Sequence, residues 1–235
     1  MAENVPFAAH TAPVPRLFDI VGFDLDGTLI DTSGDLLAAV NHVLADVGRP
    51  LLREEEIRPM IGGGAKHMLA LGLKASGGVS DAEFRPLYKQ MLRYYAANIC
   101  VYSRPFPGAV EAMDALAEQS VTLAVVTNKF ESLATDLLEQ LGLLSRFETV
   151  IGGDTLGPGN AKPSAAPIHE MIARCGGGRA VFIGDSIYDI MAAKAAGIPS
   201  IAVGFGFLDG PVEELGADAV IDGWGELVGV LNRLS

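Results

Sequence analysis

The sequence predicts an α/β protein with a parallel β-sheet in its core and a separate helical domain inserted after the first strand. Short apolar segments that end in a polar or glycine residue recur along the chain with helical patterns between them, which is typical of βα units. About 100 residues separate the first of these segments from the second, more than a crossover between parallel strands needs. The excess predicts an insertion.

The expected strands share the length and apolar composition of strands that are buried on both faces. They are residues 18–23, 121–126, 148–151, 180–183, 199–203 and 218–221. Helical patterns at residues 132–141 and 188–196 are expected to cover the sheet. Because ligands of open parallel sheets bind beyond the carboxyl ends of the strands, polar residues at those ends are the first candidates for a functional site.

The insertion is expected to be all helical, because its apolar residues recur at spacings of three and four. One such stripe runs over residues 36–47 and a second over residues 84–95. Residues 105–108, Pro-Phe-Pro-Gly, are rich in helix breakers and are expected to form the return hinge. The predicted domains are therefore a core of residues 1–31 and 105–235, and a helical domain of residues 32–104.

Composition excludes several classes of partner. Twenty-nine acidic residues against 17 basic ones give a net charge of −12, which repels nucleic acid and anionic lipid. No apolar run reaches the roughly 18 residues of a membrane-spanning helix. Residues 1–17 do not read as a signal peptide, and the two cysteines have no metal-binding spacing. We expect a cytoplasmic monomer or homodimer that acts on a small molecule, and an anionic substrate would require locally gathered positive charge.

Polar residues follow four of the predicted strand ends or loops at the same edge of the sheet. They are Asp24, Asp26, Thr127, Asn128, Lys162, Asp185 and Asp189. Asp24 and Asp26 are two residues apart and project to the same side of an extended chain. Taken alone, this pair also suits an acidic turn, but the additional acids, hydroxyl and amine favour a catalytic site.

These residue types suit phosphoryl transfer. An aspartate such as Asp24 can attack phosphorus, and Mg²⁺ held by Asp24 and Asp185 would offset the repulsion between two anions. Asp26 is placed to protonate the leaving oxygen and then to accept a proton from water. Thr127 and Lys162 can hold the phosphoryl oxygens, together with Asn128.

The segments FDLDGTLIDT, VVTNK, AKP and GDSIYDIMAAKAAG resemble the four ordered motifs of the haloacid dehalogenase superfamily. The resemblance implies a Rossmann-like parallel sheet core with an inserted all-helical cap domain. It also implies that Asp24 is the nucleophile and that Asp26 is the acid/base and lends a backbone carbonyl to Mg²⁺. It places the metal aspartate at Asp185 and a supporting acid at Asp189. The segments PFPG, LLEQLGL and IGGDT are similar to those of phosphoglycolate phosphatases.

Substrate choice is expected to depend on the cap. Gly63 and Gly64 lie ahead of a predicted helix, where free backbone N–H groups and Lys66 could bind a small carboxylate such as that of glycolate. The alternative is a flexible turn with a solvated lysine. The favoured reaction is Mg²⁺-dependent hydrolysis of 2-phosphoglycolate through a phosphoaspartate.

Other activities of the superfamily remain open. They are hydrolysis of a sugar phosphate, sugar phosphomutation and pyrophosphate hydrolysis. Dehalogenation needs no metal and would not require Asp26, Asp185 and Asp189 together. A catalytically idle binding module would not need a nucleophile with an acid two residues away.

Overall fold

The computed structural model describes residues 18–234, and the expected N-terminal leader, residues 1–17, lies outside them together with residue 235. Six parallel strands form one sheet in the order β5-β4-β1-β6-β7-β8. The strands are β1 (Ile20–Phe23), β4 (Thr122–Val126), β5 (Thr149–Ile151), β6 (Ala180–Gly184), β7 (Ser200–Val203) and β8 (Ala219–Ile221). Each begins within two residues of the position expected from the apolar segments, so the predicted α/β fold with a parallel sheet is confirmed.

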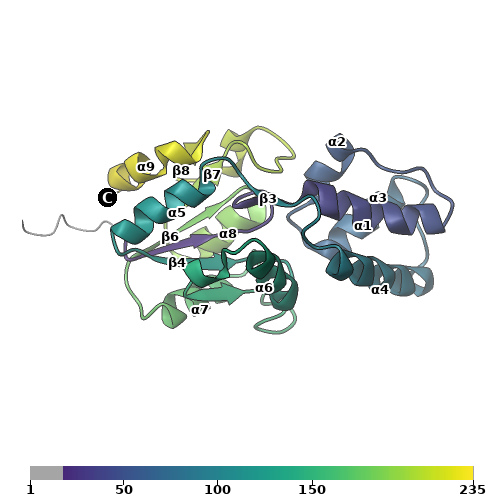
Figure 1. Cartoon of the computed structure of the whole chain (residues 1–235), viewed down its shortest axis with the longest axis horizontal. Coiled ribbons are helices and arrows are strands. Elements are labelled where there is room, and N and C mark those ends of the chain that lie inside the picture. The colour runs from purple at the N-terminus through teal and green to yellow at the C-terminus, as the bar shows by residue number, and fades with distance from the viewer. Residues whose placement is uncertain (1–17, 235) are drawn as a thin grey trace, which may run out of the picture.

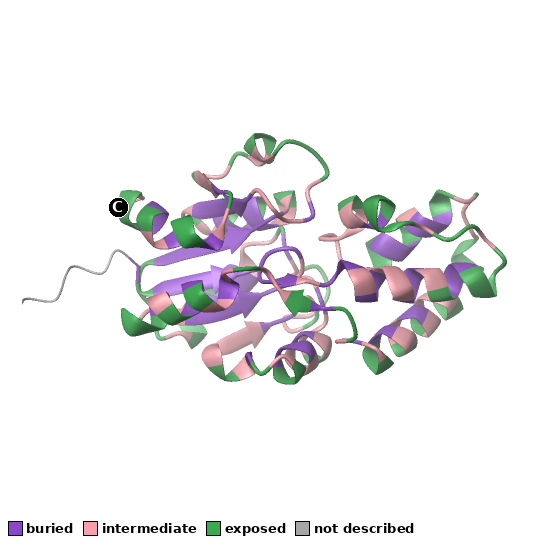
Figure 2. Cartoon of the chain, turned by 45° about the horizontal axis from the view of Figure 1, so that its top comes forward, coloured by how far each residue is buried: buried purple, intermediate pink, exposed green. Residues whose placement is uncertain are grey.

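Helices cover both faces of the sheet, as Figure 1 shows. They are α5 (Ala109–Glu118), α6 (Glu131–Gln140), α7 (Ala166–Arg174), α8 (Ile187–Ala196) and α9 (Leu227–Arg233). Alternate residues of β1 face opposite layers: Ile20 packs with Met171 of α7, whereas Phe23 belongs to the cluster that contains Met113 of α5. Because both faces are covered, the central strands β1, β6 and β7 are buried throughout their length, whereas the edge strands β5 and β8 are only partly buried (Figure 2).

The inserted segment forms a helical body at one end of the molecule (Figure 1). Its helices are α1 (Ser33–Asp46), α2 (Glu54–Ile57), α3 (Ala65–Lys74) and α4 (Asp81–Ala97). We call this body the cap. Short 3₁₀ turns complete the described chain at η1 (Arg58–Met60), η2 (Leu144–Arg146), η3 (Val212–Leu215) and η4 (Trp224–Glu226).

The chain enters and leaves the cap through two short antiparallel strands, β2 (Ile30–Asp31) and β3 (Arg104–Pro105). The sequence did not predict them, because a strand of two residues is too short to show an alternating pattern. Buried Asp35 closes this hinge by accepting hydrogen bonds from the N–H groups of Tyr102 and Ser103 at 3.0 and 2.8 Å and from the Ser103 hydroxyl at 2.6 Å. The first cap helix is thereby tied to the returning strand.

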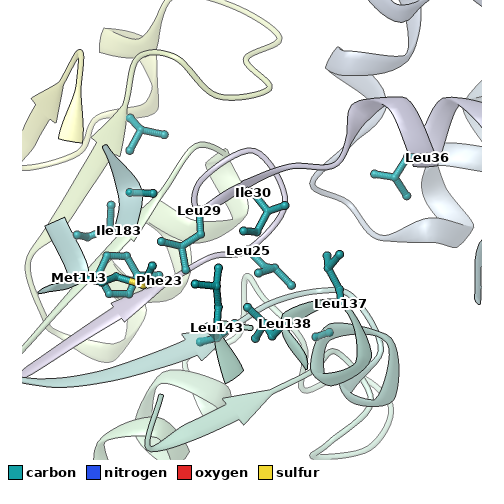
Figure 3. Close-up of a cluster of buried hydrophobic side chains, with 14 of the residues drawn as sticks. Phe23, Leu25, Leu29, Ile30, Leu36, Met113, Leu137, Leu138, Leu143 and Ile183 are labelled. Carbon is teal, nitrogen blue, oxygen red and sulfur yellow. The ribbon is translucent and has the colours of Figure 1, made fainter. Parts of the chain in front are cut away.

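The apolar core continues from the sheet toward the cap. Leu25, Leu29 and Ile30 follow β1 and lie between Phe23 and the cap residue Leu36 (Figure 3). All five are buried, so the loop after β1 is anchored on its apolar side and its polar side chains are held in place. Across residues 18–234, no helix combines the length and apolar character that crossing a bilayer requires.

Candidate active site

The site lies at the carboxyl ends of three central strands. Asp24 follows β1, Thr127 follows β4 and Asp185 follows β6. Strand β1 pairs with both neighbours, and Phe23 lies opposite Val125 on one side and Ile183 on the other. The three polar residues therefore emerge side by side at one edge, as the sequence predicted.

Lys162 is held rigidly beside Asp24. Its Nζ lies 2.7 Å from Asp24 Oδ1, 2.5 Å from Asp189 Oδ1 and 2.8 Å from the Val126 carbonyl oxygen. Burial alone would lower the pKa of Lys162, but the carboxylates of Asp189 and Asp24 outweigh this effect and raise it. The group is therefore an ammonium whose three donors are all used, which fixes its position.

Opposing effects act on the pKa of Asp24. Burial raises its pKa to about 7, against the lowering effect of Lys162, and the neighbouring Asp189 and Asp26 raise it further. Without a bound cation the carboxyl is only partly ionised at neutral pH. A cation beside it would favour the ionised, nucleophilic form.

Asp185 is positioned by two donors. The Phe207 N–H donates to Oδ2 at 2.6 Å and the Thr28 hydroxyl donates to Oδ1 at 3.2 Å. Burial, followed by the charges of Asp24 and Asp189, raises the pKa of Asp185 well above its usual value. Gly27 permits this approach, since its φ is +87° and a Cβ there would lie 2.1 Å from Asp185 Oδ2.

Carboxylate oxygens of Asp24, Asp185 and Asp189 lie within 4.8 Å of one another and are buried. Asp189 is already engaged, because Oδ1 accepts from Lys162 and Oδ2 accepts from the Ser186 N–H and hydroxyl at 3.0 and 2.5 Å at the start of α8. This leaves Asp24 and Asp185 as the better candidates to hold a metal. An all-oxygen set that carries surplus negative charge suits a hard divalent cation such as Mg²⁺.

Asp26 has a partner that sequence reasoning missed. Nζ of Lys129 lies 2.7 and 2.9 Å from the two carboxylate oxygens of Asp26, and the Thr32 hydroxyl donates to Oδ1 at 2.7 Å. The Lys129 side chain is only 5% exposed. Burial alone would lower the pKa of Lys129, but Asp26 outweighs burial and raises it, so the group is charged. The position of Lys129 directly after Thr127 and Asn128 could have indicated a role in the site, but a single sequence does not show where the Lys129 side chain points.

Thr127 makes a hydrogen bond within its own loop, and Asn128 contacts other loops of the site. The Thr127 hydroxyl oxygen accepts from the Lys129 N–H at 3.2 Å. The Asn128 amide donates to the Gly62 carbonyl at 3.1 Å and to the Lys162 carbonyl at 3.2 Å, so it joins core and cap. Its buried Oδ1 has no hydrogen-bond partner within residues 18–234. The roles of Thr127 and Asn128 in binding substrate stay predictions.

A cavity lies between this edge of the sheet and the cap. It is lined by Asp24, Asp26, Leu36, Ile61, Gly62, Gly64, Ala65, Met68, Tyr88, Tyr95, Thr127, Asn128, Lys129, Phe130 and Leu133. Gly64, which the sequence analysis selected, is among them. The predicted nucleophile Asp24 and acid/base Asp26 thus line the same cavity.

Two other cap residues selected from the sequence do not line this cavity. Gly63 and Lys66 border a separate hollow on the cap, and Lys66 is exposed. The reason is helical geometry, because Ala65 and Met68 are three residues apart and turn toward the cavity, whereas Lys66 points elsewhere. A substrate contact by Lys66 stays a prediction that its position here does not support.

The parallel sheet, the inserted cap and the buried carboxylates beside a lysine define an α/β protein with an acidic site that suits phosphoryl transfer. Residues 21–203 match the family model described as haloacid dehalogenase-like hydrolase, and the chain belongs to this family. The resemblance noted in the sequence is thereby confirmed.

Individual proteins that resemble the chain carry the name phosphoglycolate phosphatase. The chain is 42% identical over 213 residues to a phosphoglycolate phosphatase of Agrobacterium fabrum, covering 89% of this chain and 90% of the relative. It is 44% identical over 204 residues to one of Caulobacter vibrioides, covering 86% and 85%. A crystal structure of a predicted phosphoglycolate phosphatase from Haemophilus somnus superposes with a TM-score of 0.85 at 30% identity, covering 92% of this chain and 99% of that one. The expectation of a phosphoric monoester hydrolase is confirmed.

Proposed function

We propose that this enzyme is a Mg²⁺-dependent phosphatase that hydrolyses 2-phosphoglycolate through a phosphoaspartate at Asp24. The observation that carries the proposal is the buried Asp24 carboxylate, fixed at 2.7 Å from the Lys162 ammonium and facing the cavity beside Asp26. The names of the relatives from Agrobacterium fabrum and Caulobacter vibrioides support the substrate.

In the first step, an Asp24 oxygen forms a bond to phosphorus while the bond between phosphorus and the ester oxygen breaks. Protonated Asp26 gives its proton to the departing oxygen, so the alcohol leaves neutral at that atom. The Thr127 hydroxyl lines the cavity, where it can donate to an oxygen of the transferring group, and the charge of Lys162 beside Asp24 can offset negative charge that develops there.

In the second step, water attacks phosphorus and loses a proton to Asp26, which restores the acid. The bond between Asp24 and phosphorus breaks and inorganic phosphate is released. Asp26 therefore serves in both steps, and the hydrogen bonds that it accepts from Thr32 and Lys129 hold it in the lining of the cavity.

The charges of the site support a divalent cation. When all four carboxyl groups are ionised, Asp24, Asp26, Asp185 and Asp189 exceed the two ammonium groups of Lys129 and Lys162 by two negative charges. A bound Mg²⁺ would cancel that surplus and reduce the repulsion between Asp24 and a phosphate dianion. Asp24 and Asp185 would hold the ion, with the backbone carbonyl of Asp26.

The cap side of the cavity favours a small leaving group over a sugar. Leu36, Ile61, Ala65 and Met68 contribute apolar surface there, and Tyr88 and Tyr95 are the hydroxyl-bearing cap residues of the lining, fewer groups than the several hydroxyls of a sugar would need. Glycolate carries a single carboxylate on one methylene group. The geometry therefore supports 2-phosphoglycolate over the sugar phosphates that the sequence left open.

Phosphate release from a panel of 2-phosphoglycolate, sugar phosphates and pyrophosphate, with Mg²⁺ or EDTA, tests the proposal. We expect 2-phosphoglycolate to have the highest kcat/KM and EDTA to abolish turnover. Asp24→Asn should remove activity, whereas Asp209→Asn, at an exposed aspartate, is the matched control. Preference for another ester would refute the substrate, and full activity of Asp24→Asn would refute the covalent route.

A further inference from the structure

The cavity contains a buried positive charge that the phosphoryl chemistry does not require. Lys129 is the one basic side chain among the described residues that line the cavity, since Lys162 is directed at Asp24 and Asp189 behind it. Placing a lysine where its side chain is only 5% exposed carries a desolvation cost. Asp26 offsets that cost, but its two oxygens accept at most two of the three donors of the ammonium.

The position of Lys129 relates directly to the leaving group. Asp26 is the group that protonates the departing oxygen, so this oxygen must come within hydrogen-bond distance of its carboxyl. Nζ of Lys129 is 2.7 Å from the same carboxyl. A negative charge one methylene group away from the departing oxygen therefore falls within reach of Lys129.

Tyr95, from the cap helix α4, adds a second hydrogen-bond donor beside Lys129. The residue is 2% exposed, and its hydroxyl makes no hydrogen bond of normal geometry in the described part of the chain, although the Lys129 ammonium lies near enough to interact with it. A buried hydroxyl without a well-formed hydrogen bond is costly, and Tyr95 lines the cavity. Nζ of Lys129 lies over the Tyr95 ring, 4.8 Å from its centre, so a core side chain and a cap side chain are in direct contact beside the cavity.

We infer that Lys129 and Tyr95 form the subsite that binds the carboxylate of the leaving group and thereby select anionic over neutral phosphate esters. The inference rests on the proposed phosphatase function and goes beyond it by assigning the residues that set specificity. A strongly acidic chain needs local positive charge to bind an anionic substrate. Lys129 brings that charge to the leaving-group end of the cavity.

The test compares two substrates of nearly equal shape, 2-phosphoglycolate and 2-phosphoglycolamide, in which an amide replaces the carboxylate. For each enzyme variant, kcat/KM is measured with both at saturating Mg²⁺, and the ratio of the two values reports the subsite. Lys129→Met removes the charge, and Tyr95→Phe removes one oxygen. Thr32→Val removes the other hydrogen bond to Asp26 and leaves Lys129 in place. Lys89→Met, at an exposed lysine of α4, is the matched control.

We expect the native enzyme to prefer the carboxylate and Lys129→Met to lower that preference at least tenfold, beyond any loss common to both substrates. Tyr95→Phe should lower the preference about threefold, in keeping with a single neutral donor. Thr32→Val should slow both substrates alike and Lys89→Met should leave the ratio as it is. The ratio separates specificity from the positioning of Asp26, which affects both substrates equally.

Three outcomes would overturn the inference. They are an unchanged ratio in both Lys129→Met and Tyr95→Phe, native enzyme that does not discriminate between the substrates, and a selective loss in Lys66→Ala instead. If Lys129→Met fails to fold, Tyr95→Phe decides through two measurements, its substrate ratio and its inhibition by free glycolate. Only the carboxylate subsite predicts that glycolate inhibits Tyr95→Phe more weakly than native enzyme. Native enzyme that cleaves neither substrate would refute the proposed function itself, which is distinguishable from cleavage of both at equal rates.

Discussion

Replacing Asp24 by asparagine is expected to make the metal-free protein more stable while it abolishes activity. The pKa of Asp24 is about 7 in the folded chain and 3.8 in the unfolded chain, chiefly because the carboxyl is buried. The folded state therefore binds the proton more tightly. The stability that this provides is fully present below pH 3.8 and is lost as the pH rises toward 7.

The size of the effect follows from the difference in pKa. About three units correspond to about 4 kcal/mol of lost stability above pH 7, and to about 2 kcal/mol at pH 5, where the loss is incomplete. Asparagine does not ionise, so it escapes this loss and can still accept a hydrogen bond from Lys162. We expect Asp24→Asn to be more stable than the native protein by about 2 to 4 kcal/mol at pH 8 in EDTA, and by about half as much at pH 5.

Urea unfolding in EDTA, followed by circular dichroism at pH 5 and pH 8, measures this difference. Asp209→Asn controls for the loss of a carboxylate at an exposed position. Mg²⁺ should reverse the order, because the cation stabilises only the protein that keeps its ligands. A variant no more stable than native protein at pH 8, or a gain of equal size at both pH values, would refute the assigned electrostatics.

Three further changes test the metal site and the hinge. Asp185→Asn should shift the Mg²⁺ midpoint of thermal stabilisation at least tenfold upward in a thermal-shift titration, and a native midpoint would exclude this residue as a ligand. Gly206→Ala should lower kcat more than tenfold, because a Cβ there would lie 2.2 Å from that of Asp185; steady-state kinetics with native rates would contradict the crowding. Asp35→Ala removes the acceptor for Tyr102 and Ser103 and should cost about 2 to 4 kcal/mol in urea unfolding, a loss that an unchanged midpoint would disprove.

The fold could be predicted because its strands are buried on both faces. Such strands must be continuously apolar, and turns or polar residues must end them, so β1, β4 and β6 are visible as separate segments of the sequence. Strand order was not visible, since it depends on which apolar faces pack together. The two-residue strands β2 and β3 were missed because their pairing depends on the hinge rather than on any local pattern.

The candidate site was predictable in its residue types and only partly in its contacts. Motif spacing led to Asp24, Lys162 and Asp185, which the structure brings to one edge of the sheet. The pairing of Lys129 with Asp26 joins residues 103 positions apart and depends on the direction of one side chain at the end of β4. For Lys66, the sequence predicted a contact that the structure does not support. A basic residue after a run of glycines suits an anion site, but its position on helix α3 directs it away from the cavity.

Contacts across the site link the position of the cap to both chemistry and specificity. Thr32, directly before the first cap helix, donates to Asp26, and Asn128 of the core donates to Gly62, which lies ahead of α3. Lys129 lies between the two domains, paired with Asp26 and placed 4.8 Å from the ring centre of Tyr95. Water and product must pass this boundary, so we expect the cap to move during turnover. Since Tyr95 moves with the cap and Lys129 stays with the core, the proposed carboxylate subsite is complete only when the cap is closed. Substrate charge can then favour the closed arrangement in which Asp26 is oriented for proton transfer, and a neutral ester loses both the contact and part of this closure.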